Sequence, residues 1–172
     1  MAIIIESPNE VYSLENQRNF KLFLAGSITD CPDWQAEVIE KVKHLSNLTV
    51  YNPRRANFPI GDPKAAEEQI TWEYKKLKES DGVSFWFDSG SLGPITLYEL
   101  GRWGNSSYDK SLVIGIHKEY QRKQDVEIQT NLSRPGTKIS YSIDNLVHDI
   151  ISMVSAQNAF PNTLSNVRLS KK

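Results

Sequence analysis

From residue 20 onward, short apolar runs alternate with longer amphipathic stretches. The apolar runs predict buried strands, whereas the longer stretches carry apolar residues at helical spacing and predict helices. Such alternation predicts a parallel sheet with right-handed crossovers and helices on both faces. Strands are expected at 20–28, 48–55, 82–88, 110–117 and 137–142, and helices at 31–46, 64–81, 94–104 and 143–157. The predicted fold class is therefore a three-layer α/β domain with a mostly parallel, five-stranded sheet.

The chain has 172 residues, which is enough for one domain with a sizeable core. We expect this domain at residues 20–157. Residues 1–19 are expected to form an N-terminal extension, in which 2–5 is a possible additional edge strand. Residues 158–172 are polar and predict a flexible C-terminal tail, and the charged region 118–138 gives no clear pattern.

Composition excludes several classes of protein. Twenty basic residues against 21 acidic ones give a net charge of −1, so no broad electrostatic footprint for nucleic acid or membrane is present. The single cysteine, Cys31, excludes an internal disulfide and fits a reducing compartment. The sequence begins without a basic signal-peptide region, and we expect a cytoplasmic protein. The three histidines lie far apart, so neither a metal nor a cofactor is expected.

Ligands of such sheets bind beyond the carboxyl ends of the strands, near the topological switch point. Three segments are expected to converge there, namely Gly26-Ser27, residues 52–55 and residues 88–93. The Gly26-Ser27 pair precedes a helix and predicts a modest anion site, although it matches no dinucleotide or nucleoside triphosphate fingerprint. Arg54 is a candidate phosphate ligand, but an arginine in a loop is more often simply solvated.

The stretch SLGPITLYELG (91–101) contains a lone glutamate, Glu99, among apolar neighbours. Residues 96–99 match a capping box, in which this glutamate would bond back to the start of the helix. Against that interpretation, Pro94 is favoured at the first position of a helix. If Gly93 is the N-cap, Glu99 lies more than one turn inside and cannot cap the helix. Spacing alone leaves the capping and functional interpretations equally supported.

Two further carboxylates are predicted near the same sheet edge. The apolar stripe of the 64–81 helix is predicted to consist of Ile70, Tyr74 and Leu77, with the charges of Lys75, Lys76, Lys78 and Glu79 mostly outside it. Glu73 lies within this stripe, where a carboxylate is costly unless it is paired or extends past the stripe to solvent. Asp88 ends the third strand, where either ligand binding or turn formation explains it. Three acidic groups from three elements together favour a chemical role.

Four segments, FLAGSITDCPDWQAEVIEKV, VYNPRR, ITWEYKKLKESDGVSFWFD and GPITLYELGRW, together resemble the nucleoside 2-deoxyribosyltransferase-like family. The resemblance implies a flavodoxin-like sheet and an enzyme of nucleotide metabolism that works without a cofactor. Its reaction would be cleavage or transfer at the N-glycosidic bond of a (deoxy)ribonucleoside or its 5′-monophosphate. The resemblance makes Glu99 the nucleophile of a glycosyl-enzyme intermediate, Glu73 the second carboxylate and Asp88 the ligand of a sugar hydroxyl. The best-known transferases have aspartate where this chain has Glu73, and their spacing between the positions of Asp88 and Glu99 is shorter.

Related hydrolases hold a 5′-phosphate with the Gly-Ser loop and with small polar residues before the catalytic helix. The expected substrate-binding residues are Gly26, Ser27, Asn52, Arg54, Ser91 and Gly93. Because the transferases complete each site with a neighbouring subunit, a homo-oligomer is also expected. The protein would bind a small nucleoside or nucleotide, and neither a nucleic acid polymer nor a membrane. The alternative is a non-catalytic module that binds a nucleotide or an ADP-ribose-like ligand and needs no carboxylates.

Overall fold

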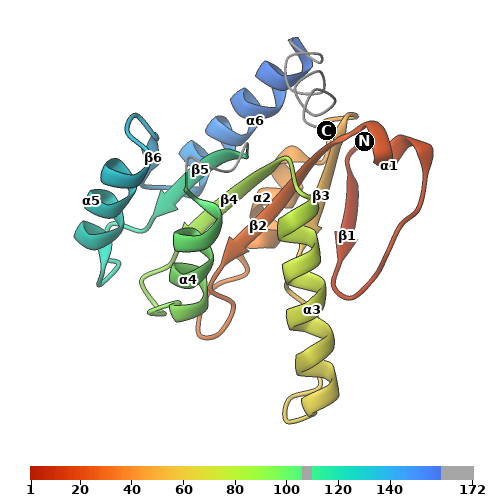
Figure 1. Cartoon of the computed structure of the whole chain (residues 1–172), viewed down its shortest axis with the longest axis horizontal. Coiled ribbons are helices and arrows are strands. Elements are labelled where there is room, and N and C mark those ends of the chain that lie inside the picture. Colours follow the sequence, from red (N-terminus) through yellow and green to blue (C-terminus); the bar gives the residue numbers. More distant parts are fainter. Residues whose placement is uncertain (106–109, 160–172) are drawn as a thin grey trace, which may run out of the picture.

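Six parallel strands form one sheet at the centre of the computed structural model, which describes residues 1–105 and 110–159 (Figure 1). The strands are β1 (Ile3–Glu6), β2 (Phe20–Gly26), β3 (Leu48–Asn52), β4 (Gly82–Phe87), β5 (Ser111–Ile116) and β6 (Ile139–Ser140), and their order is β1-β3-β2-β4-β5-β6. All five pairings are parallel. The predicted α/β class is confirmed, and the possible strand at 2–5 is the sixth strand, β1.

Helices cover both faces of this sheet (Figure 1). On one face lie α2 (Trp34–Val42) and α6 (Ile143–Ala159), and on the other lie α3 (Pro63–Glu79), α4 (Pro94–Trp103) and α5 (Lys123–Ser133). The short α1 (Leu14–Arg18) leads into β2. Helices α1 and α5 were not predicted, because α1 has only five residues and α5 buries only Val126 and Thr130 of its eleven.

Two hydrophobic cores follow from the pleat of the strands. Successive side chains of a strand point to opposite faces, so Leu22 and Leu24 pack toward α2 and α6, while Phe23 and Ala25 pack toward α3, α4 and α5. All six residues of β4 are buried. Burial on both faces explains why the sequence shows continuous apolar runs instead of polar–apolar alternation.

The buried face of α3 differs from the predicted stripe. Ile70 and Tyr74 are 65% and 45% exposed, whereas Trp72, Lys76 and Leu77 are buried. The ammonium of Lys76 lies 5.0 Å from the centre of the Tyr51 ring and 2.5 Å from a carboxylate oxygen of Glu10. Lys76 is therefore buried with two counter-charges, Glu79 on α3 itself and Glu10 from the residues before the predicted domain, and the pattern of α3 contains only the first.

The strand order places the topological switch point beside β2. The chain leaves β2 for β3 on one side, and after α3 it returns to β4 on the other side of β2. The loop after β2 is fixed by Trp34, whose Nε1 donates a hydrogen bond to the carbonyl oxygen of Ser27 at 3.1 Å. The carboxyl ends of β2, β3 and β4 thus meet at one edge.

No helix among residues 1–105 and 110–159 is long and apolar enough to span a bilayer. The same residues contain no cluster of three or more histidine, cysteine, aspartate or glutamate side chains suited to a metal ion. Most of the predicted C-terminal tail, residues 160–172, lies outside the described residues.

Candidate functional site

A cavity of about 350 Å³ lies at the edge where β2, β3 and β4 end. The loops after these strands and the helices α3 and α4 line it with Phe23, Ala25, Gly26, Ser27, Ile28, Thr29, Pro53, Glu73, Ser91, Gly93, Pro94, Ile95, Thr96 and Glu99. Glu73 and Glu99 are the two titratable residues of this lining. The structure therefore brings together two of the three predicted carboxylates with four of the six predicted substrate-binding residues, Gly26, Ser27, Ser91 and Gly93.

Helix α4 begins in a way that excludes the capping interpretation of Glu99. Its N-cap is Gly93 and its first residue is Pro94, so Glu99 is the sixth residue of the helix. Gly93 has φ +58°, a backbone conformation that glycine adopts without strain. A side chain on Gly93 would also collide with Ser27, because its Cβ would lie 2.4 Å from the hydroxyl oxygen. This glycine lets α4 start directly against the loop after β2.

The carboxyl of Glu99 has an unusual electrostatic environment. Burial raises the pKa of Glu99 to about 8, and the neighbouring charge of Glu73 adds to this increase. No donor among the described residues forms a hydrogen bond with the Glu99 carboxylate to offset its burial. Such a perturbed carboxyl inside a cavity is typical of a functional group.

Glu73 differs from Glu99 because it has a hydrogen-bond donor. Nε2 of Gln69, one turn earlier on α3, donates to Oε1 of Glu73 at 2.7 Å. Burial raises the pKa of Glu73, and this hydrogen bond lowers it in part. Two carboxyls in one cavity ionise in two coupled steps, so ionisation of Glu73 makes ionisation of Glu99 more costly.

The edge of the cavity opposite these carboxylates is suited to an anion. The hydroxyl of Ser27 is buried and has no hydrogen-bond partner in the described part of the chain. It lies against Gly93, where no side chain caps α4. The first N–H groups of a helix lack acceptors within the helix and favour negative charge.

Asp88, Asn52 and Arg54 do not line the cavity. Asp88 accepts hydrogen bonds from Trp86 Nε1 at 3.2 Å and from the backbone N–H of Gly90 at 2.9 Å. Asn52 accepts a hydrogen bond at 3.0 Å from the backbone N–H of Arg54. The Arg54 guanidinium donates to the carbonyl oxygens of Pro32 and Cys31 at 2.8 and 3.2 Å. These contacts give all three residues a structural role, and their binding of substrate stays a prediction.

Sequence reasoning missed Gln69, which lies four residues before Glu73. The i, i+4 spacing places both side chains on one face of a helix, and this spacing was the available signal. Arg55, which follows Arg54 in the same loop, forms an ion pair with Glu68 at 3.2 Å. A second cavity of about 370 Å³ lies between α4 and α5, but its one carboxylate, Asp125, is 53% exposed and pairs with Arg122.

Two comparisons with known proteins find a match. The sequence profile of a family described as nucleoside 2-deoxyribosyltransferase like matches residues 19–120. A solved structure of a conserved protein from Enterococcus faecalis is 16% identical, with a TM-score of 0.54, and the match covers 78% of this chain and 99% of that one. At this identity the likeness concerns the fold alone. No curated protein sequence matches the chain significantly.

Replacement of Glu99 by glutamine should remove a pH-dependent cost of folding. A carboxyl with a raised folded-state pKa stabilises the fold when protonated, and this stability is lost as the pH rises from about 4.5 toward 8. We expect Glu99→Gln to match the wild type in unfolding free energy at about pH 4 and to exceed it by roughly 1–3 kcal/mol at about pH 8.5. Denaturant titrations at both pH values measure this difference. The exposed Glu67→Gln is the control, and a difference independent of pH would contradict the prediction.

Proposed function

The chain belongs to the nucleoside 2-deoxyribosyltransferase-like family, and on this basis we propose that it cleaves or transfers at the N-glycosidic bond of a (deoxy)ribonucleoside or its 5′-monophosphate. The proposal is carried by the two carboxyls, Glu73 and Glu99, that line one cavity and whose pKa values are both raised by burial. An N-glycosidase needs an ionised carboxylate that attacks the sugar carbon and, at the same time, a protonated carboxyl that gives its proton to the departing base.

In the first half-reaction, the ionised carboxylate of Glu99 attacks C1′ of the sugar. The C1′–N bond breaks through an oxocarbenium-like transition state, and its electron pair stays on the nitrogen of the departing base. The proton of the carboxyl pair passes from Glu73 to the base, which leaves as the neutral molecule. The product is an ester between Glu99 and the sugar. Because the pKa of Glu99 is raised to about 8, this step uses the less populated form of the pair, in which Glu73 holds the proton.

In the second half-reaction, water or a nitrogen of a second base attacks C1′ of this ester. The bond to Glu99 breaks, its electron pair returns to the carboxylate, and Glu73 accepts the proton of the attacking group. Attack by water makes the protein a hydrolase, and attack by a base makes it a transferase. The two outcomes use the same residues and differ in how well the site excludes water.

We further propose that a 5′-monophosphate is preferred over the unphosphorylated nucleoside. The unpartnered hydroxyl of Ser27 and the uncapped start of α4 favour an anion at one edge of the cavity. The carboxylates of Glu73 and Glu99 repel a phosphate, so they favour the orientation that places it at this edge with C1′ toward them. Arg54 is held by backbone carbonyls, so the hydroxyl and backbone N–H groups would carry the binding.

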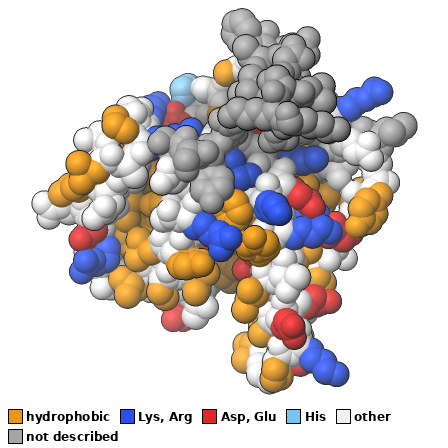
Figure 2. Space-filling model, in the orientation of Figure 1, with side chains coloured by type: hydrophobic (Ala, Val, Ile, Leu, Met, Phe, Trp, Pro, Cys, Tyr) orange, Lys and Arg blue, Asp and Glu red, His pale blue; other side chains and the backbone are white. Residues whose placement is uncertain are grey.

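The exposed apolar residues of α3 and α4 support assembly of the protein with a second copy. Ile70 and Tyr74 on α3 are 65% and 45% exposed, and Ile95 and Tyr98 on α4 are 66% and 64% exposed. Figure 2 shows hydrophobic side chains gathered over these two helices. Exposed apolar residues clustered in this way favour an interaction site, and here they border the cavity because Ile95 also lines it.

Removal of the nucleophile should abolish turnover while the fold is retained. We expect purified protein to release free base from at least one member of a panel of nucleosides and 5′-monophosphates. Glu99→Ala should lower kcat by roughly three or more orders of magnitude, as expected when covalent catalysis is lost, and Glu67→Gln should not. Chromatography of the released base measures both. Ligand binding without base release by the wild type would instead favour the non-catalytic binding module.

The phosphate preference is tested by comparing kcat/KM for a deoxynucleoside and its 5′-monophosphate. We expect roughly a tenfold preference for the monophosphate, because a charge-assisted hydrogen bond and a helix start together contribute a few kcal/mol at most. Ser27→Ala should reduce this ratio several-fold and leave kcat/KM for the unphosphorylated nucleoside nearly unchanged. A preference for the nucleoside in the wild type would contradict the proposed phosphate site.

The assembly is tested by analytical ultracentrifugation of variants with one charge added to the apolar surface. The wild type should sediment as a dimer or larger oligomer, and Ile70→Asp should shift it toward the monomer. Ile128→Asp, which adds the same charge at a 50% exposed position on α5, serves as the matched control. A monomeric wild type, or equal effects of both variants, would rule out this surface as the interface.

A further inference from the structure

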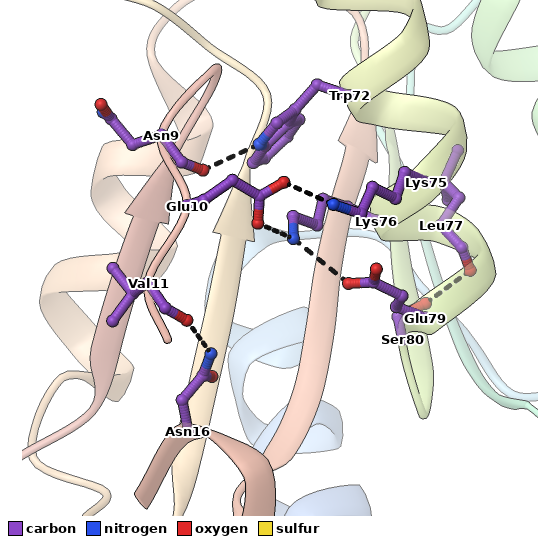
Figure 3. A network of polar contacts seen from close by, with 10 residues as sticks. All are labelled: Asn9, Glu10, Val11, Asn16, Trp72, Lys75, Lys76, Leu77, Glu79 and Ser80. Atoms are coloured by element: carbon purple, nitrogen blue, oxygen red, sulfur yellow. Dashed lines mark hydrogen bonds and ion pairs between the residues drawn. The ribbon is translucent and has the colours of Figure 1, made fainter. Parts of the chain in front are cut away.

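Part of the chain that supports the site lies outside the matched family region. The N-terminal segment, defined here as residues 1–18, precedes the matched residues 19–120. Its strand β1 pairs with β3, with Glu6 opposite Asn52 at the site edge of the sheet. The residues that follow β1 contact α3, the helix that carries Glu73 (Figure 3).

Two sets of contacts fasten the N-terminal segment to α3 (Figure 3). Trp72 Nε1 donates a hydrogen bond to the carbonyl oxygen of Asn9 at 2.9 Å. The carboxylate of Glu10 lies between two lysines of α3, 2.9 Å from Nζ of Lys75 and 2.5 Å from Nζ of Lys76. None of these residues lines the cavity, so these contacts hold the segment without touching the site.

Ser7 connects the N-terminal segment to the site. Its hydroxyl is buried and donates a hydrogen bond to Oε1 of Gln69 at 2.6 Å. Nε2 of Gln69 donates to the carbonyl oxygen of Pro53 and to Oε1 of Glu73, both at 2.7 Å. A carbonyl oxygen only accepts, so the amide nitrogen must face Pro53. The Gln69 amide therefore has one orientation, which directs an N–H at Glu73.

We propose that Gln69 is a positioning residue for Glu73, and that Ser7 of the N-terminal segment, together with the carbonyl oxygen of Pro53, holds its amide in place. This inference rests on the proposed function. The hydrogen bond occupies one carboxyl oxygen of Glu73 and leaves the other for the transferable proton. It also stabilises the ionised carboxylate against the cost of burial. The hydrogen bond therefore favours the pair with one proton over the pair with two, and the former is the state that glycosidic cleavage uses.

The charged groups around Glu73 are few. Glu99 on α4 is the other titratable residue that lines the cavity, and its charge opposes the ionisation of Glu73. Other charged side chains on or beside α3 have partners of their own. Lys75 and Lys76 pair with Glu10, and Arg55 pairs with Glu68. The Gln69 amide is thus the group that favours ionised Glu73 in the described residues.

The test is a carbon-13 NMR titration of the glutamate carboxyl groups in the full chain, with Glu73→Gln and Glu99→Gln assigning the signals. In Gln69→Leu we expect the midpoint of Glu73 to rise by about one pH unit, because nothing then offsets its burial. In Ser7→Ala it should rise by a few tenths of a unit. In both variants the midpoint of Glu99 should stay near its wild-type value, because Glu73 is already ionised when Glu99 loses its proton.

Glu10→Gln is the matched control, because it loosens the same segment on α3 without touching Gln69. It should lower Tm and leave both midpoints within about 0.2 units of the wild type. A loosening large enough to admit water to the cavity would lower both midpoints, so the sign of the Glu73 shift separates positioning from packing. An unchanged or lowered Glu73 midpoint in Gln69→Leu overturns the proposal, and Ser7→Ala decides it if the leucine variant does not fold.

Activity gives a second measurement on the same variants. Gln69→Leu should lower kcat by about tenfold with little change in KM, since proton transfer to the base occurs in the transition state. The acid limb of its pH–rate profile should move upward with the Glu73 midpoint. If the wild type releases no base, the proposed enzymatic function fails, while the NMR titration still decides whether Gln69 controls the ionisation of Glu73.

Discussion

The cost of ionising two carboxyl groups in one partly buried cavity is the constraint on which the rest of the site depends. Each unit of pKa shift corresponds to about 1.4 kcal/mol between the two protonation states, so Glu73 and Glu99 cannot both be charged cheaply near neutral pH. The structure treats them unequally, because Gln69 donates to Glu73 and no described residue donates to Glu99. This difference favours ionisation of Glu73 over that of Glu99, so the proposed attack by Glu99 requires its proton to pass to Glu73.

The fold brings these groups together with little local strain. A parallel sheet collects the carboxyl ends of β2, β3 and β4 at one edge, and the switch in strand order opens a space there. Gly93 allows α4 to start against Ser27, and the helix then carries Glu99 to the cavity one and a half turns later. The position of Glu99 thus follows from a glycine and a proline that the sequence places before it.

Much of this arrangement could be predicted from the sequence, because it depends on local pattern. The apolar runs located β2 to β5, and the Gly-Pro pair located the start of α4. The stripe on α3 was predicted wrongly, since burial of Lys76 requires Glu10, which is 66 positions away in the chain. The contact between Ser7 and Gln69 spans 62 positions. Pairings of this kind depend on tertiary packing, and no periodicity within one helix indicates them.

Hydrogen-bond satisfaction separates the predicted site residues into two groups. Asp88 and Arg54 are polar and near the same sheet edge, yet their hydrogen-bonding atoms have partners within the chain. The hydroxyl of Ser27 and the carboxyl of Glu99 are at least partly buried, face one cavity and have no such partner in the described residues. An unsatisfied buried polar group costs free energy in the empty protein, and a ligand that bonds to it recovers that cost. Within the cavity, a bound ligand could therefore recover this cost at Ser27 and at Glu99.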